Sequence, residues 1–210
     1  MPDPSPLPPI DLDDGPAGRI IAMTRELLLR DGYSGLTMDH LAFALGMSKK
    51  TIYTHFPSKD AIVSAIIAAT GATIRRQVQA AMTKGDPFPV KFKSVLGIIG
   101  AQFGPMGPNF LDDLHRHAPA LAREIDTLKE NNIPIVFNLL LSDGIAQGMV
   151  RPDTDIPFVT AYWIQIIKGI HDPAVLAKTG LTPRAAFDKS IELFFRGLLT
   201  DKGRKASQLS

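Results

Sequence analysis

Apolar residues recur at three- and four-residue spacing along nearly the whole chain between its two ends, and strand-like alternation is absent. Such spacing gathers the apolar side chains on one face of a helix, whereas a half-buried strand needs a period of two. The pattern therefore predicts an all-α fold. Pro134 lies inside the longest expected helix and predicts a kink, because proline removes a backbone hydrogen bond. We expect helices at 17–31, 37–45, 48–55, 57–84, 88–103, 108–117, 119–148, 155–171 and 183–200.

Both ends of the chain lack the apolar pattern. Residues 1–16 are proline-rich and hold four aspartates with no lysine or arginine, and residues 201–210 are polar. Segments that bury little apolar surface cannot offset the entropy of ordering, so we expect a disordered arm at 1–16 and a disordered tail at 201–210. The start of the chain has neither a basic stretch nor an apolar run, and no run reaches the roughly 18 residues of a membrane span. We expect a soluble, cytoplasmic protein.

Composition excludes several classes of chemistry. The chain has no cysteine, which removes disulfides, thiol catalysis and cysteine-ligated metal. It has no glycine loop of the kind that cradles phosphate and no glycine-flanked nucleophilic serine. We therefore expect neither an enzyme nor a bound cofactor. The mild positive balance of residues 17–60, six basic against four acidic, permits nucleic-acid binding without requiring it.

The segment from Thr37 to Phe56 has the spacing of a helix-turn-helix. Thr37 and Ser48 are residues that cap helix N-termini, and Gly46 tolerates the left-handed turn that the motif needs. Leu41 and Leu45 on the first helix, and Ile52 and Phe56 on the second, are spaced to pack where the helices cross.

The second helix of this segment predicts two unlike faces. Lys49 and Tyr53 share one stripe and Lys50 and Thr54 the adjacent one, while Ile52 points away from both. Polar, basic side chains beside an apolar anchor suit a helix that lies in the major groove of DNA. A short solvated helix that carries two lysines is the alternative, because helix-turn-helix pairs are also plain packing units.

Residues 32–63, GYSGLTMDHLAFALGMSKKTIYTHFPSKDAIV, resemble the DNA-binding domain of the TetR family throughout. The Ile52-Tyr53 pair, followed by His55-Phe56 and Ser58-Lys59, is the most distinctive match. The resemblance implies a DNA-binding domain at 17–65 and a helical ligand-binding and dimerisation domain at 66–200. It further implies a homodimeric transcriptional regulator, usually a repressor that a small-molecule ligand releases from a palindromic operator.

Carried over residue by residue, the resemblance implies roles for the helix-turn-helix side chains. Thr37, Tyr53 and Lys59 would contact phosphates, and His55 would lie near the DNA backbone. Lys49, Lys50 and Thr51 would reach toward base edges. The candidate DNA-binding residues are Thr37, Ser48, Lys49, Lys50, Thr51, Tyr53, Thr54, His55 and Lys59.

The larger domain offers candidates for two further surfaces, each with ordinary core packing as the competing role. Apolar and aromatic residues with a few polar groups are typical of a ligand pocket. Candidate pocket residues are Phe103, Met106, Phe110, His115, Phe137, Asn138, Phe158, Tyr162, Trp163 and Gln165. The resemblance places the dimer interface on the last two expected helices. Candidate interface residues are Ala161, Ile164, Lys168, Ile191, Phe194, Phe195 and Leu198.

Two other functions remain open from the sequence. Asp113 and His117 are four residues apart and so share a helix face, but an Asp–His pair alone is weak support for a metal site, and none is expected. A helical ligand-binding or adaptor protein whose helix-turn-helix no longer binds DNA is the alternative function. The intact Thr37, Tyr53 and Lys59 argue against that alternative.

Overall fold

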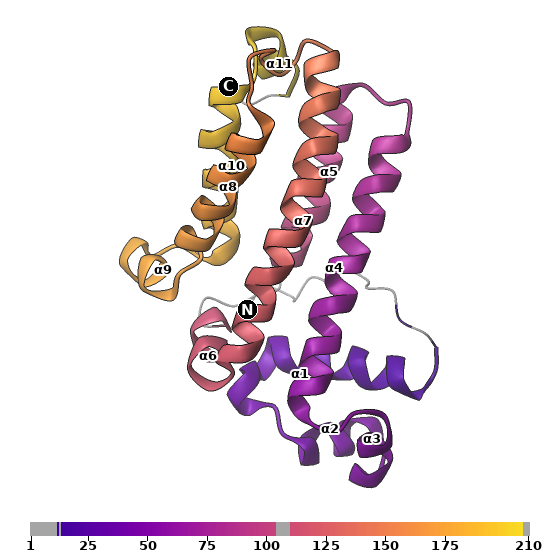
Figure 1. Cartoon of the computed structure of the whole chain (residues 1–210). Helices are drawn as coiled ribbons and strands as arrows, with labels where there is room; N and C mark the ends of the chain where they lie inside the picture. Colours follow the sequence, from indigo (N-terminus) through magenta and orange to yellow (C-terminus); the bar gives the residue numbers. More distant parts are fainter. Residues whose placement is uncertain (1–11, 13, 104–109, 208–210) are drawn as a thin grey trace. The chain divides into compact units, whose positions relative to one another are not determined.

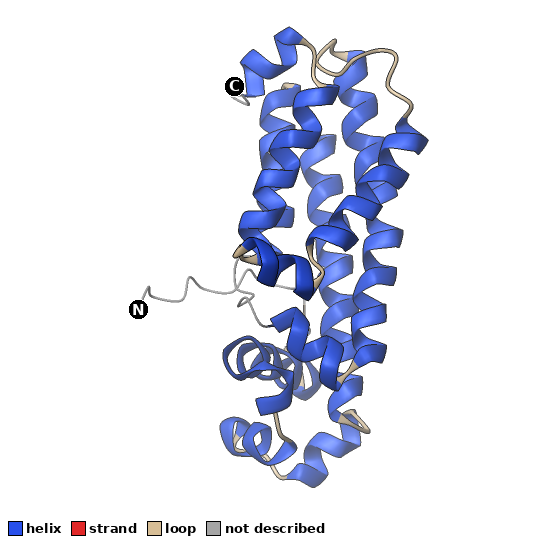
Figure 2. Cartoon of the chain, turned by 90° about the vertical axis from the view of Figure 1, so that its left-hand side faces the viewer, coloured by secondary structure: helices blue, strands red, loops and turns tan. Residues whose placement is uncertain are grey.

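The computed structural model describes residue 12 and residues 14–103 and 110–207, with the backbone alone at position 103. Within these ranges it contains helices joined by loops and no strand; one isolated bridge pairs Val150 with Leu199 (Figure 2). The predicted all-α fold is confirmed. None of the described helices combines the length and the apolarity that a membrane crossing requires.

The chain divides into two compact units, and each consists of two separate stretches of sequence. Unit 1 comprises residues up to 73 together with 105–128, and unit 2 comprises 74–104 together with 129–210. This division differs from the expected boundary at residue 65. Residues 105–128 fold with the N-terminal segment because Leu114, Ala118 and Leu121 are buried in its hydrophobic core.

Unit 1 is a helical domain in which α1 packs most extensively against α6. Its core takes fully buried side chains from every helix, among them Ile20, Leu41, Ile52, Ile62 and Leu114. Its elements, labelled in Figure 1, are α1 (Pro16–Gly35), α2 (Met38–Leu45), α3 (Lys49–His55), the first part of α4 (Lys59–Thr83), α6 (Phe110–His117) and the start of α7 (Pro119–Ala146).

Unit 2 has a core rich in aromatic rings. Phe92 meets Phe195 edge to face with ring centroids 4.7 Å apart, and Trp163 stacks on Phe137 at 6.0 Å. Edge-to-face and offset pairs of this kind are favourable beyond the area that they bury. The unit holds the remainders of α4 and α7 together with α5 (Phe88–Phe103), α8 (Ile156–Ile170), α9 (Pro173–Thr179), α10 (Pro183–Leu198) and α11 (Asp201–Ser207).

Two helices were not expected from the sequence. Helix α9 begins at the Asp172-Pro173 pair, where the Asp172 carboxylate accepts from the N–H of Ala174, and it ends at Gly180 with φ +68°. Helix α11 contradicts the expected disordered tail over residues 201–207. Thr200 caps α11 through the N–H of Gly203, and Arg204 donates to the carbonyls of Arg196 and Leu199 at the end of α10. Polar contacts therefore order a segment that its composition predicted to be disordered.

Helix α1 extends past its expected end. It runs to Gly35, but Gly32, directly after the expected end at residue 31, interrupts the helical conformation with φ +76° and ψ 174°. Helix α7 continues through Pro134 as one element, so the proline does not end it.

Candidate DNA-binding surface

Local hydrogen bonds shape the turn between α2 and α3 as the sequence predicted. Thr37 caps α2 by accepting from the N–H of His40, and Ser48 caps α3 by accepting from the N–H of Thr51. Gly46 ends α2 in the left-handed conformation, φ 62° and ψ 28°. The N–H of Met47 donates to the carbonyl of Ala42 at 3.0 Å, which closes the turn. Residues 37–55 therefore form a helix-turn-helix with both N-termini capped by side chains.

Apolar anchors decide which face of α3 is presented to solvent. Ile52 is completely buried, Leu41 is buried to 1% exposure, and Phe56 is partly buried against the same core. Because α3 is short and Ile52 points inward, its remaining side chains lie outside the core. Lys49, Lys50, Thr51, Tyr53, Thr54 and His55 are all exposed.

The exposed side chains of α3 differ in how far they are already engaged. Lys50 makes no hydrogen bond or ion pair with any residue that the structure describes, and the Tyr53 side chain is half exposed. The hydroxyl of Thr54 donates to the carbonyl of Thr51 at 2.6 Å, and the Ser48 and Thr51 hydroxyls lie 2.9 Å apart. Lys50, Tyr53 and His55 are therefore the side chains of α3 most available to a partner.

Lys49 pairs with a residue that the sequence analysis did not single out. Its ammonium nitrogen lies 2.8 Å from a carboxylate oxygen of Asp39, in the first turn of α2. The hydrogen bond from Lys49 to that carboxylate, and then its negative charge, raise the pKa of the lysine. The pairing directs this cation toward α2.

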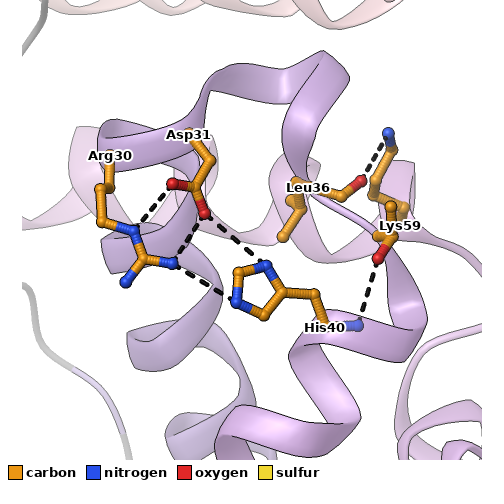
Figure 3. Close-up of polar contacts among 6 residues, drawn as sticks. Arg30, Asp31, Leu36, His40 and Lys59 are labelled. Carbon is orange, nitrogen blue, oxygen red and sulfur yellow. Dashed lines mark hydrogen bonds and ion pairs between the residues drawn. The ribbon is translucent and has the colours of Figure 1, made fainter.

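Lys59, at the start of α4, serves the turn between α1 and α2. Its ammonium donates to the carbonyls of Tyr33 and Leu36, both at 3.0 Å, and lies 3.8 Å from the centre of the Tyr33 ring. Figure 3 shows the contact with Leu36. Partial burial lowers the pKa of Lys59. Two of its three N–H donors are thus engaged inside the protein, which leaves one for the phosphate contact that the family resemblance implies.

Tyr33 links the same turn to α4 through its hydroxyl. The buried phenol donates to Asp60 at 2.5 Å. Burial, and then the hydrogen bond to Asp60 and its charge, raise the pKa of Tyr33. On the other side of the turn, Arg30 donates two hydrogen bonds to Asp31, both at 2.8 Å, and the ring of His40 lies against this pair (Figure 3). The sequence predicted neither contact, because the partners of Tyr33 and His40 are distant along the chain.

The candidate pocket residues belong to both units and differ in their burial. Phe137 and Trp163 are buried in the core of unit 2, whereas Phe110 and His115 belong to unit 1. Asn138, Phe158, Tyr162 and Gln165 are exposed. Met106 lies outside the described residues, and only the backbone of Phe103 is described.

The candidate interface residues divide between core and surface. Ile191, Phe195 and Leu198 are buried in the core of unit 2, as the competing packing role predicted. Ala161 is exposed, Ile164 and Phe194 are partly buried, and Lys168 pairs with Glu130 at 2.5 Å. The exposed apolar side chains of α8 and α10 are instead Phe158, Tyr162 and Leu193, with exposed fractions of 65%, 54% and 76%.

No three histidine, aspartate or glutamate side chains gather as metal ligands in the described ranges. Asp113 and His117 lie on one face of α6, as their spacing predicted, with 3.7 Å between Oδ1 and Nε2. Among the groups near Asp113, the N–H of Ser34 makes a shorter contact than His117 does.

Comparison of the sequence with known proteins agrees with the helix-turn-helix geometry. Residues 20–66 match the family described as bacterial regulatory proteins, tetR family. The uncharacterized HTH-type transcriptional regulator YvaF of Bacillus subtilis (strain 168) is 27% identical over 191 residues, which are 90% of this chain and 98% of that protein.

Two solved structures share the fold over nearly their whole length. The fatty acid degradation regulator FadR from Bacillus halodurans has a TM-score of 0.64 and 16% identity, covering 87% of this chain and 96% of that one. The regulator FadR from Bacillus subtilis, solved in complex with stearoyl-CoA, has a TM-score of 0.60 and 16% identity, covering 84% of this chain and 96% of that one. At these identities the likeness shows the fold.

Proposed function

Because the chain belongs to the tetR family of bacterial regulatory proteins, which are transcriptional regulators and not enzymes, we propose that it is a homodimeric repressor. Its two copies of α3 bind a palindromic operator, and a small molecule with an apolar part, bound in unit 2, releases them. As a regulator of transcription it acts in the cytoplasm, where the DNA is.

The exposed face of α3 is the observation that carries this proposal. Ile52 anchors the helix from below, and Lys50 and Tyr53 extend from the opposite side. The major groove admits an α-helix, lysine suits the acceptors of guanine, and a tyrosine hydroxyl suits a phosphate oxygen. Lys50 and Tyr53 are therefore the side chains on which recognition depends most.

A second copy of this chain is the proposed occupant of the exposed apolar surface on α8 and α10. Phe158 stacks on Tyr162 with ring centroids 6.2 Å apart, and Tyr162 stacks on Phe194 at 6.3 Å, so the rings form one continuous surface. Large apolar side chains gathered in one patch mark interaction sites. One helix of seven residues reads too few base pairs to locate a site, so recognition also needs two copies.

The proposed effector is a small molecule with an apolar part, and a long-chain acyl-CoA is the first compound to test. The FadR protein of Bacillus subtilis, which shares this fold, was solved with stearoyl-CoA. The core of unit 2, which includes Phe137 and Trp163, holds side chains of the apolar and aromatic kind that ligand sites use. Release follows if the ligand binds the conformation that does not fit the operator more tightly by a few kcal/mol.

The test is a selection of genomic DNA fragments by the purified protein at near-physiological salt, with Lys50→Ala and Tyr53→Phe run in parallel. We expect enrichment of one palindromic site and weaker enrichment with both variants. Diffuse binding that both variants leave unchanged would support the alternative, in which the helix-turn-helix no longer recognises DNA. Adding stearoyl-CoA to the complex with the enriched site then tests the effector separately. A complex that stearoyl-CoA does not release would refute the proposed effector and leave the proposed DNA binding intact.

A further inference from the structure

Helix α6 presents a carboxylate to the turn that precedes the helix-turn-helix. The N–H of Ser34 donates to Oδ2 of Asp113 at 3.0 Å, although the two residues are 79 positions apart in the sequence. Asp113 is partly buried, and α6 packs against α1 more extensively than any other helix of unit 1 does. The contact therefore joins a residue outside the family match at 20–66 to the segment that leads into α2.

The backbone conformation at Gly32 makes this contact possible. Its φ of +76° with ψ of 174° is a combination that essentially only glycine adopts. A Cβ built at this position would lie 2.7 Å from Oδ2 of Asp113 and 3.5 Å from its Cγ. The carboxylate thus occupies the space beside the glycine, and any side chain there would displace it.

The charge of Asp113 is stabilised by the turn itself. Burial acts to raise its pKa, but hydrogen bonds from the backbone and side chain of Ser34 and from the backbone of Tyr33 outweigh burial and hold the pKa below the ordinary value. A charged acceptor strengthens the hydrogen bonds that it receives. His117, one helical turn further along α6, adds a weaker attraction at 3.7 Å.

Helix α4 donates hydrogen bonds to carbonyl groups of the same turn, whereas α6 accepts a hydrogen bond from a backbone N–H of the turn. Lys59 donates to the carbonyls of Tyr33 and Leu36, and Asp60 accepts from the Tyr33 hydroxyl. The next residue, Thr37, caps α2. The start of α2 is therefore fixed between a carboxylate on α6 and an ammonium on α4.

We propose that Asp113 is a positioning residue for DNA recognition: it fixes the turn at residues 32–36, and through that turn the placement of α2 and α3, without contacting DNA. The inference rests on the proposed DNA-binding function of α3. It assigns to α6, which lies beyond the helix-turn-helix in sequence, a direct part in the affinity for a specific site.

The experiment compares full-length D113N and D113E with D112N. Asp112 is the matched control, because it lies next to Asp113 on α6 and pairs with Arg116 instead of the turn. Each protein is measured for its affinity for the selected site, its affinity for a random duplex, and the exchange rate of the Ser34 amide hydrogen. For D113N we expect at least about fivefold weaker binding to the selected site, unchanged binding to the random duplex, and faster exchange at Ser34.

The control and the second variant make the outcomes distinct. D112N should match the unmodified protein in all three measurements. D113E keeps the charge but moves it by one methylene, so it should lose specific affinity to a smaller extent, and it carries the test if D113N does not fold. Faster exchange at Ser34 in either Asp113 variant with unchanged specific affinity would overturn the proposal. Failure of the unmodified protein to prefer any site would instead overturn the proposed function.

Discussion

The ammonium of Lys49 lies 2.8 Å from the carboxylate of Asp39, and this contact ties the first residue of α3 to the first turn of α2 while both side chains remain more than half exposed. An exposed pair of this kind stabilises a fold only weakly. Its larger consequence is for DNA, because it sets a negative charge beside the recognition helix and neutralises a cation there.

Replacing Asp39 by asparagine should therefore change DNA binding more than stability. With Lys49 released, we expect tighter binding to random duplex and a slope of log affinity against log salt that is steeper by about one. The melting temperature should hardly change. The control is Asp153→Asn, in a loop of unit 2. Asp60→Asn is unsuitable, because Asp60 accepts a hydrogen bond from Tyr33. An unchanged salt slope in Asp39→Asn would contradict the role given to this pair.

The two tyrosines of unit 1 should separate stability from DNA binding. Tyr33→Phe removes the 2.5 Å hydrogen bond to Asp60, and we expect it to lower the free energy of unfolding by about 1–2 kcal/mol. Tyr53→Phe removes an exposed hydroxyl from α3, and we expect weaker operator binding with little change in stability. Urea denaturation and binding to the selected duplex measure both effects. The reverse pattern would show that the roles of the two hydroxyls are misassigned.

The raised pKa of Tyr33 gives the first of these variants a pH dependence. Because the pKa is higher in the folded than in the unfolded state, the stabilisation is present below about pH 10, the unfolded value, and is lost as the pH rises further. The stability difference between the unmodified protein and Tyr33→Phe should thus shrink above pH 10. A difference that stays constant from pH 8 to pH 11 would contradict the burial and hydrogen bonding assigned to this phenol.

Gly32 and Gly46 both have positive φ, but substitution should affect them unequally. At Gly46 an added Cβ meets nothing within 4 Å, so Gly46→Ala costs only the left-handed conformation, about 1 kcal/mol. At Gly32 the Cβ would lie 2.7 Å from Asp113 in a backbone region that other residues avoid. Gly32→Ala should therefore be the more destabilising by urea denaturation. Equal effects would mean that the turn moves away from Asp113 freely.

The exposed rings of α8 provide the test of dimerisation. Tyr162→Glu places a charge in the surface formed by the rings of Phe158, Tyr162 and Phe194, and burying an unpaired charge opposes association. We expect sedimentation to show a dimer for the unmodified protein and a monomer for Tyr162→Glu. Lys178→Glu, on α9, is the control and should remain dimeric. A monomeric unmodified protein would refute the proposed interface.

The features predicted correctly from sequence are those that depend on near neighbours. The caps at Thr37 and Ser48 and the turn at Gly46 involve residues no more than five positions apart, so helix periodicity and residue type sufficed. The burial of Ile52 was predictable from the same local pattern, because Ile52 lies one helical turn before Phe56 and faces the core.

The side-chain contacts that the sequence did not predict in unit 1 depend on residues far apart in the chain. Asp113 and Ser34 are 79 positions apart and Lys59 and Tyr33 are 26 apart, and no local pattern pairs them. The burial of the candidate pocket residues was not predictable from sequence for a related reason. Large apolar side chains pack in a core as readily as they line a ligand site. Residue type therefore does not distinguish Phe137, which is buried, from Phe158, which is exposed.

The affinity ratio between the selected palindromic duplex and a random duplex of equal length, at near-physiological salt, tests the central claim most directly. If α3 reads base edges through Lys50 while Tyr53 fixes the helix on a phosphate, the unmodified protein should prefer the selected duplex by about a thousandfold or more. Lys50→Ala and Tyr53→Phe should then each weaken binding to that duplex. A ratio near one, with affinity that falls steeply with salt and is the same in both variants, would show that the protein binds phosphates alone and would contradict the account.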